Sequence, residues 1–362
     1  MIISDIRTQL LCVPYEDPPK IGFIDIGNIN LLIVEIETSS GLIGMGYLHP
    51  IAGGLQTIEM CIHEMMKPLL IGKSATEVES LWKAMWDATF IQGRMGITVM
   101  AMSAIDIALW DLIGKKENKP LWKLWGGDDT PLPVYGSGCY RGLGHDGMIE
   151  KAKAFVSEGY KAIKMQVAWG FTHNEDVTNV RDMRQELGDN IKIMIDVNQG
   201  WNVREAISFG KAIEEYDIEW LEEPVMTDNF DGYHEIANSI TTPLAGGENH
   251  FTHHDLDPFI KSGKIPTLQP DIMRGGYTEL KVIAELSNSN NIKIAPHLFM
   301  ELNTHLNASI PNASRLEHMG WYNHLWVEPI IPKNGTAQPP DIAGHGMQFK
   351  PELFKEYPYK KI

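Results

Sequence analysis

Seven charged or titratable side chains recur at regular spacing through the last two thirds of the 362-residue sequence. Nearly every one ends a short apolar run, and successive members lie 20 to 32 residues apart, a spacing that suits one strand and one helix per step. The seven residues are Lys164, Asp196, Glu222, Glu248, Asp271, His297 and Glu317. Seven residues in register predict one shared site at the ends of successive strands.

Three of these residues are carboxylates that end consecutive runs, namely Asp196, Glu222 and Glu248. Two such charges 4 Å apart repel by roughly 4 kcal/mol even at an effective dielectric constant of about 20. A salt bridge to a Lys or Arg would explain any one of them alone. Three together favour a divalent cation, and ligands that are all oxygen favour Mg²⁺ over Zn²⁺.

The next two residues, Asp271 and His297, would end adjacent strands. An aspartate that accepts a hydrogen bond from one imidazole nitrogen fixes the tautomer and raises the basicity of the other nitrogen. The pair is therefore a candidate acid/base catalyst, although a histidine satisfied within a structural network is the other interpretation.

Lys164 and Gln166 are two residues apart and therefore face the same way in a strand. Lys164 would place positive charge near a substrate, and Glu317 could stay protonated and donate to a substrate carboxylate. A salt bridge from Glu317 to Arg315 is the alternative. Together with a metal and a His–Asp pair, these parts suit removal of a proton α to a carboxylate.

The elements that must position these residues fall into two patterns. The first 130 or so residues read as an α+β unit, with strands in 30–48, helices over 56–70 and 100–115, and a boundary at Pro131 and Pro133. After this, eight apolar runs alternate with amphipathic segments and predict a closed parallel α/β barrel. The runs are VYGSG, AIKMQVA, IKIMIDVN, IEWLEEP, PLAGGEN, TLQPDIM, IKIAPHLF and SRLEHM.

The amino-acid composition argues against some classes of binding partner. The 31 basic and 47 acidic residues give a formal net charge of −16, which argues against nucleic acid and against an anionic membrane surface. We find no apolar run of about 18 residues and no secretory signal pattern, so we expect a cytoplasmic protein. The widely spaced Cys12, Cys61 and Cys139 are interpreted as reduced thiols.

The ordered set of motifs resembles the enolase superfamily, and within it the mandelate racemase subgroup. The motifs are AMSAIDIALWDLIGKKENKPLWKLWGG, the strand at Lys164, IDVNQGW, WLEEP, GGEN, QPDIMRGGYTE, PHLFMELNTHL and RLEHM. The resemblance implies a (β/α)7β TIM-like barrel over residues 131–325. It also implies an α+β capping domain over 1–130, completed by a C-terminal segment over 326–362.

The resemblance further implies roles for the seven residues. Asp196, Glu222 and Glu248 would bind Mg²⁺, His297 with Asp271 would be one acid/base catalyst, and Glu317 would hydrogen-bond the carboxylate of a small-molecule substrate. A homo-oligomer is expected, because the family tends to assemble.

Loops of the cap over 15–30 and 47–54 would close over the substrate, with Lys20, Tyr47 and His49 as polar candidates or as solvated loop residues. Asn198 and Gln166 are further candidates for substrate binding. Arg141 could pair with a distal carboxylate, which would favour a diacid, or could be a surface arginine.

One departure from the family pattern bears on the reaction. The family's racemases carry Lys-x-Lys on the second strand, with the second lysine as a base, whereas this chain has Lys164-Met165-Gln166. Glutamine cannot accept a proton at ordinary pH. A dehydratase that converts a sugar acid, either an aldonate or an aldarate, to a 2-keto-3-deoxy acid is therefore expected. The alternatives are a 2-hydroxy-acid racemase or epimerase with another base, such as Lys164, and a catalytically silent barrel.

Overall fold

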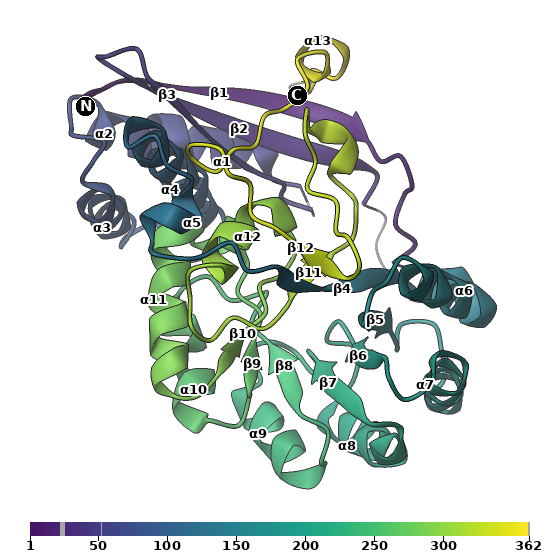
Figure 1. The fold of residues 1–362 in the computed structure, drawn as a ribbon. Coiled ribbons are helices and arrows are strands. Elements are labelled where there is room, and N and C mark those ends of the chain that lie inside the picture. Colours follow the sequence, from purple (N-terminus) through teal and green to yellow (C-terminus); the bar gives the residue numbers. More distant parts are fainter. Residues whose placement is uncertain (22–25, 52, 361–362) are drawn as a thin grey trace.

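The computed structural model describes residues 1–21, 26–51 and 53–360. The chain forms an N-terminal cap of sheet and helices that lies over the mouth of an α/β barrel (Figure 1). The elements of the cap are β1 (Ile3–Pro14), β2 (Asn28–Thr38), β3 (Ile43–Leu48), α1 (Leu55–Cys61), the π-turn η1 (Ile62–Met66), α2 (Lys67–Leu70), α3 (Val78–Ala88), α4 (Ile97–Lys116) and α5 (Leu121–Leu124).

The cap sheet is antiparallel in the order β1-β2-β3, and α4 packs against β3. Gly44 and Gly46 allow this close approach, because a Cβ at either position would lie 2.2 Å from the carbonyl oxygen of Ala108 or Ala104. Among the described residues, α4 is the one helix long and apolar enough to cross a membrane. This helix differs from the expectation that no apolar run reaches about 18 residues. Since 83% of its apolar window is buried, α4 serves as a core helix.

Eight parallel strands form the barrel in the order β10-β9-β8-β7-β6-β5-β4-β11. Backbone hydrogen bonds from Ile294 N to Asn312 O and from Ser314 N to Ile294 O close the ring. The strands are β4 (Leu132–Cys139), β5 (Ala162–Gln166), β6 (Lys192–Asp196), β7 (Ile218–Glu222), β8 (Leu244–Gly246), β9 (Thr267–Leu268), β10 (Lys293–Ile294) and β11 (Leu316–His318). The predicted parallel barrel is confirmed.

A helix follows each barrel strand except the last, which gives the (β/α)7β pattern. These helices are α6 (Gly144–Ser157), α7 (His173–Leu187), α8 (Val203–Ala212), α9 (Phe230–Ser239), α10 (His253–Ser262), α11 (Gly276–Ser289) and α12 (Met300–Asn307). Short turns η2 (Arg141–Leu143), η3 (Glu214–Tyr216) and η4 (Ile272–Arg274) lie in the connections between strands and helices, and η5 (Asn323–Leu325) follows β11.

A layer of large and small buried side chains lies inside the barrel. They are Tyr135, Ala162, Met194, Trp220, Ala245 and Ala295. Side chains two residues further along a strand lie on the same face, one step nearer the C-terminal end. This parity places Lys164, Asp196, Glu222 and His297 above that layer, at the mouth of the barrel.

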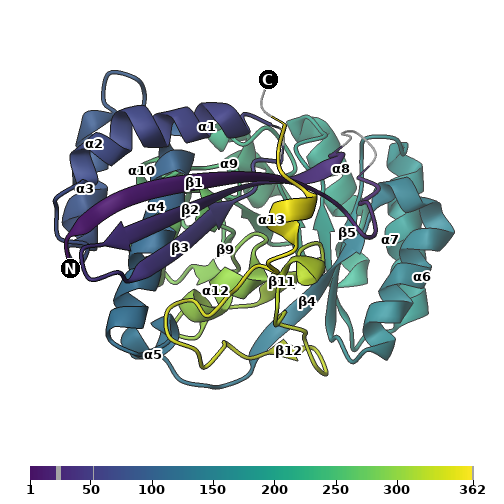
Figure 2. The ribbon, with the colours of Figure 1, turned by 90° about the horizontal axis from the view of Figure 1, so that it is seen from above.

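The chain after the barrel returns to the cap. It contains β12 (Thr336–Ala337), which pairs with β4, and α13 (Leu353–Glu356). Beyond α13, Cys12 N donates to Tyr357 O and Tyr359 N donates to Leu10 O, so this segment pairs with β1. Figure 2 shows the C-terminal segment, in yellow, crossing the purple cap sheet.

Candidate active site

A cavity of about 390 Å³ lies between the barrel mouth and the cap. Of the residues predicted from the sequence, eight line it: His49, Lys164, Gln166, Asp196, Asn198, Glu248, Asp271 and His297. Glu222 and Glu317 lie just beneath, bound to Lys164, whereas Tyr47 and Arg141 do not line it. Barrel strands β5 to β10 and the cap therefore build the site together.

The three carboxylates come from neighbouring strands. Asp196 and Glu222 are directly paired positions of β6 and β7, and Glu248 follows β8. Burial raises the pKa of Glu222 to about 8, and the nearby Asp196 and Glu248 add to this rise although Lys164 opposes it. Burial, partly offset by His297, also raises the pKa of Glu248. The cluster thus carries more acid groups than the local positive charge can balance.

Lys164 binds two glutamates at once. Its Nζ lies 2.6 Å from Glu222 Oε1 and 2.8 Å from Glu317 Oε1, and all three side chains are buried. Burial alone would raise the pKa of Glu317, but Lys164 and His297 lower it to about 2, and Leu298 N donates to its Oε2. Glu317 is therefore ionised and paired with Lys164, which differs from both sequence alternatives, the protonated acid and the bridge to Arg315.

Asp271 and His297 form the expected pair. Asp271 Oδ2 lies 2.9 Å from His297 Nδ1, and Asp271 Oδ1 accepts from Met273 N. The other ring nitrogen, Nε2, is 3.5 Å from Glu248. Burial lowers the pKa of His297, but Glu248 and Asp271 outweigh it and raise the pKa to about 10.

Gln166 belongs to a chain of hydrogen bonds along the wall of the cavity. Its Nε2 donates to Asn198 Oδ1 at 3.2 Å, and Arg141 Nη2 donates to the same oxygen at 2.7 Å. Asn198 Nδ2 in turn donates to Asp196. Arg141 is buried and does not line the cavity, so its hydrogen bond holds Asn198 in place and the predicted contact with a distal carboxylate is not supported.

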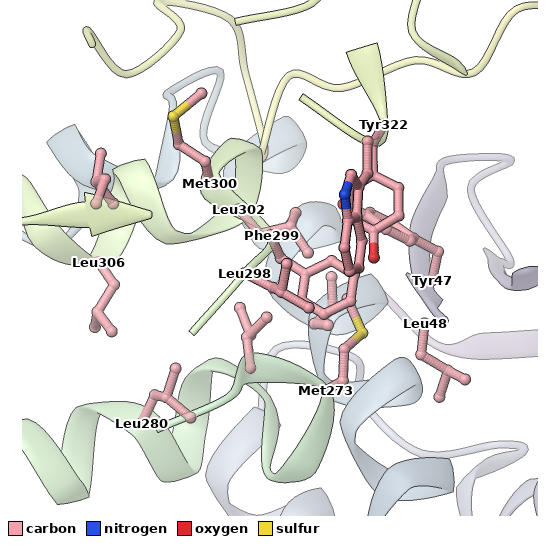
Figure 3. Packing of buried hydrophobic residues seen from close by; sticks show 14 of the residues in the cluster. Tyr47, Leu48, Met273, Leu280, Leu298, Phe299, Met300, Leu302, Leu306 and Tyr322 are labelled. Carbon is pink, nitrogen blue, oxygen red and sulfur yellow. The ribbon is translucent and has the colours of Figure 1, made fainter. Parts of the chain in front are cut away.

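The two candidate residues of the cap, His49 and Tyr47, lie in different surroundings. His49 lines the cavity, its Nδ1 lies 3.0 Å from Tyr322 Oη, and burial lowers its pKa to about 3, which keeps the ring neutral. Tyr47 is fully buried and donates to Glu301. Figure 3 shows Tyr47 among apolar side chains that include Phe299 and Tyr322. Tyr47 therefore packs the cap against the barrel. Lys20 does not line the cavity, and residues 22–25 and 52 of the two loops lie outside the described residues.

Besides Gln199, three polar residues that line the cavity were missed from the sequence: Glu223, Asn249 and Arg274. Asn249 Nδ2 donates to both carboxylate oxygens of Glu223, and Arg274 Nη2 donates to Asn249 Oδ1. Each stands within one to three residues of a predicted site residue, in WLEEP, GGEN and QPDIMRGG. Glu223 has a φ of 39°, a left-handed conformation typical of strained positions at functional sites.

A barrel of this topology, with acid groups and a His–Asp pair at its mouth and a cap over them, defines a class of metal-assisted barrel enzymes. Two family models agree with this assignment. "Mandelate racemase / muconate lactonizing enzyme, N-terminal domain" matches residues 5–126, and "Enolase C-terminal domain-like" matches residues 147–353. The chain belongs to the enolase superfamily, in the group of mandelate racemase and muconate lactonizing enzyme.

Different relatives are named for different reactions. The chain is 34% identical to 3,6-anhydro-alpha-L-galactonate cycloisomerase of Streptomyces coelicolor, with 96% of each chain covered. It is 30% identical to arabinonate dehydratase of Saccharolobus solfataricus, covering 99% of this chain and 100% of the relative. A solved racemase from Streptomyces coelicolor with bound magnesium superimposes with a TM-score of 0.94 at 32% identity, covering 99% and 100% of the two chains. The relatives are thus enzymes, both dehydratases and isomerases.

Proposed function

We propose that this protein is a Mg²⁺-dependent dehydratase that converts a sugar acid to a 2-keto-3-deoxy acid. The observation that carries the proposal is an intact His297–Asp271 pair in the same cavity as Gln166, a residue that cannot act as a base. One base is enough for dehydration, because the same imidazolium can return the proton to the departing hydroxyl.

Magnesium is the cofactor of the proposal, and the donor set fits it. Asp196, Glu222 and Glu248 offer only oxygen ligands, and burial, together with the nearby charges of Asp196 and Glu248, raises the pKa of Glu222. Among the described residues no three side chains already surround a common point as metal ligands, because Glu222 contacts Lys164 and Glu248 faces His297. When bound, Mg²⁺ supplies positive charge next to the substrate carboxylate as negative charge develops there.

The chain's own residues would perform the proton transfers. Glu248 is the carboxylate that most raises the pKa of His297, and its engagement as a Mg²⁺ ligand would remove this effect and leave the imidazole neutral. His297 Nε2 would then take the proton from the carbon next to the carboxylate, while Asp271 holds the opposite nitrogen and stabilises the resulting imidazolium. The bond between C3 and its hydroxyl then breaks, and the hydroxyl leaves as water with the proton from His297. The enol that remains becomes the 2-keto-3-deoxy acid. Lys164, held from beneath by Glu317, would face the carboxylate of the substrate, and the cap over the cavity would keep bulk water away.

Isomerisation is the second candidate, and similarity to a cycloisomerase and a solved racemase supports it. A two-base racemase would need Lys164 as its second base, and the surroundings of Lys164 argue against this role. Burial lowers its pKa, but Glu222 and Glu317 more than offset this and hold the pKa well above its usual value. An ammonium bound to two carboxylates is a poor base.

The test is a panel of aldonates and aldarates incubated with enzyme and Mg²⁺, with an assay for 2-keto acids. We expect product from at least one acid, no product with chelator, and none from His297→Asn. His145→Asn, a change on surface helix α6 outside the cavity, is the matched control and should be fully active. In D₂O a one-base enzyme exchanges the α-hydrogen of a single epimer. Racemisation of a 2-hydroxy acid without keto-acid product would refute the dehydratase.

A further inference from the structure

Arg274 is a cation on the cavity wall whose charge the proposed reaction does not use. It belongs to the turn η4 that follows Asp271, and it lines the same cavity as Lys164 and His297. No Asp or Glu of the described part of the chain lies within ion-pair distance of its guanidinium.

The guanidinium is nevertheless held in a fixed place. Its Cζ lies over the Phe251 ring, 4.9 Å from the ring centre, and Nη2 donates to Asn249 Oδ1 at 3.0 Å. Asn249 is itself fixed by two hydrogen bonds to Glu223. A planar fork held by stacking and by one hydrogen bond is arranged in advance to bind a carboxylate through its remaining donors.

The other cations near the cavity are already engaged. Lys164 is paired with Glu222 and Glu317, and His297 lies between Asp271 and Glu248. Arg141 donates to Asn198 and does not itself line the cavity. The acid groups at the mouth would repel a second negative charge on a substrate unless a cation received it.

We propose that Arg274 is a specificity-determining residue that binds a second carboxylate at the far end of the substrate, so that the preferred substrates are diacids of the aldarate type. The inference rests on the proposed function, and it replaces Arg141, which the sequence suggested for this task. A cavity of about 390 Å³ is large enough for a six-carbon hydroxylated diacid.

The experiment compares acids that differ only at the far end, galactarate with galactonate and glucarate with gluconate. Binding is measured by calorimetry with Mg²⁺ on the His297→Asn protein, which cannot turn them over, and turnover is measured on the protein with His297 intact. Each is repeated with Arg274→Met and Arg274→Lys. Arg204→Met, at an exposed position of α8, is the matched control.

We expect each diacid to bind more tightly than its matched monoacid. Loss of a charged hydrogen-bonding partner in Arg274→Met should weaken diacid binding by about 10- to 100-fold and change monoacid binding by less than about threefold. Arg274→Lys should recover part of the loss, since lysine keeps the charge but not the fork. Arg204→Met should behave as the unchanged protein.

Three results would overturn the inference: tighter binding of the monoacids, equal losses for both acids in Arg274→Met, or no binding of either acid. Equal losses would identify Arg274 as a residue that merely positions Asn249. If diacids bind through Arg274 but no keto acid forms, the dehydratase proposal fails while the role of Arg274 stands. If monoacids are dehydrated and diacids are not, the dehydratase stands and the inference fails.

Discussion

Replacing Lys164 by methionine tests the charge balance beneath the active site. The Nζ of Lys164 lies 2.6 Å from Glu222 and 2.8 Å from Glu317, with the lysine side chain 3% exposed and both glutamates fully buried. Removing one member of such a network leaves a buried charge without a partner and lowers the free energy of unfolding by about 3 to 5 kcal/mol. With an unfolding entropy of about 2.1 cal/mol/K per residue, the melting temperature of the 362-residue chain falls by about 4 to 7 °C.

The assay is calorimetric melting at pH 7.5 in the presence of a chelator, so that no divalent cation replaces the lysine. The matched control is Lys153→Met, which removes a lysine from the half-exposed pair with Glu186 and should change stability by less than about 1 kcal/mol. Adding Glu317→Gln to Lys164→Met should restore part of the loss, because Glu317 is the ionised partner. Equal melting of Lys164→Met and the unchanged protein would refute the reasoning.

Three further outcomes are expected. Burial raises the pKa of Glu301 to about 7 from 4.5, so the folded protein binds the extra proton, and stability falls as pH rises through that window. Glu301→Gln should therefore raise the free energy of unfolding by up to about 3 kcal/mol at pH 8 and by almost nothing at pH 4, in denaturant titrations; an equal gain at both pH values would contradict this. Asp271→Asn should lower the turnover number by at least about 100-fold and leave Mg²⁺ affinity intact, since only the orientation of His297 is lost; unchanged turnover would exclude the pair. Asp196→Asn should weaken Mg²⁺ binding by at least about tenfold in calorimetry, and an unaltered affinity would remove it from the ligand set.

The positions of the residues at the strand ends could be predicted because strand geometry alone determines where these side chains lie. A period of two fixes which side of β5 or β6 Lys164 and Asp196 occupy, and parallel pairing brings the C-terminal ends together whatever the helices do. The same logic placed His297 next to Asp271 from nothing more than consecutive strands.

Residues on turns could not be placed in this way. Arg141 and Arg274 both follow barrel strands within a few residues, and no sequence period distinguishes them. Their directions are set by contacts with Asn198 and with Phe251 and Asn249, which exist only once the barrel has closed. Tyr47 failed as a candidate for the same reason, because its direction depends on Glu301, 254 residues away. Strand β1 was not predicted either, because its pairing depends on β2 and on the C-terminal segment, which is distant in the sequence.

The pairing of β1 with the returning tail has a consequence for how the protein is made. Residues 10 and 12 bond to residues 357 and 359, so the edge of β1 waits for a partner that the ribosome adds almost 350 residues later. During that interval the first strand presents unpaired backbone groups, which is a hazard for aggregation. A nascent chain can thus form its barrel before its cap is complete. Loss of residues 357–359 would remove the backbone hydrogen bonds that join the C-terminal segment to β1 of the cap.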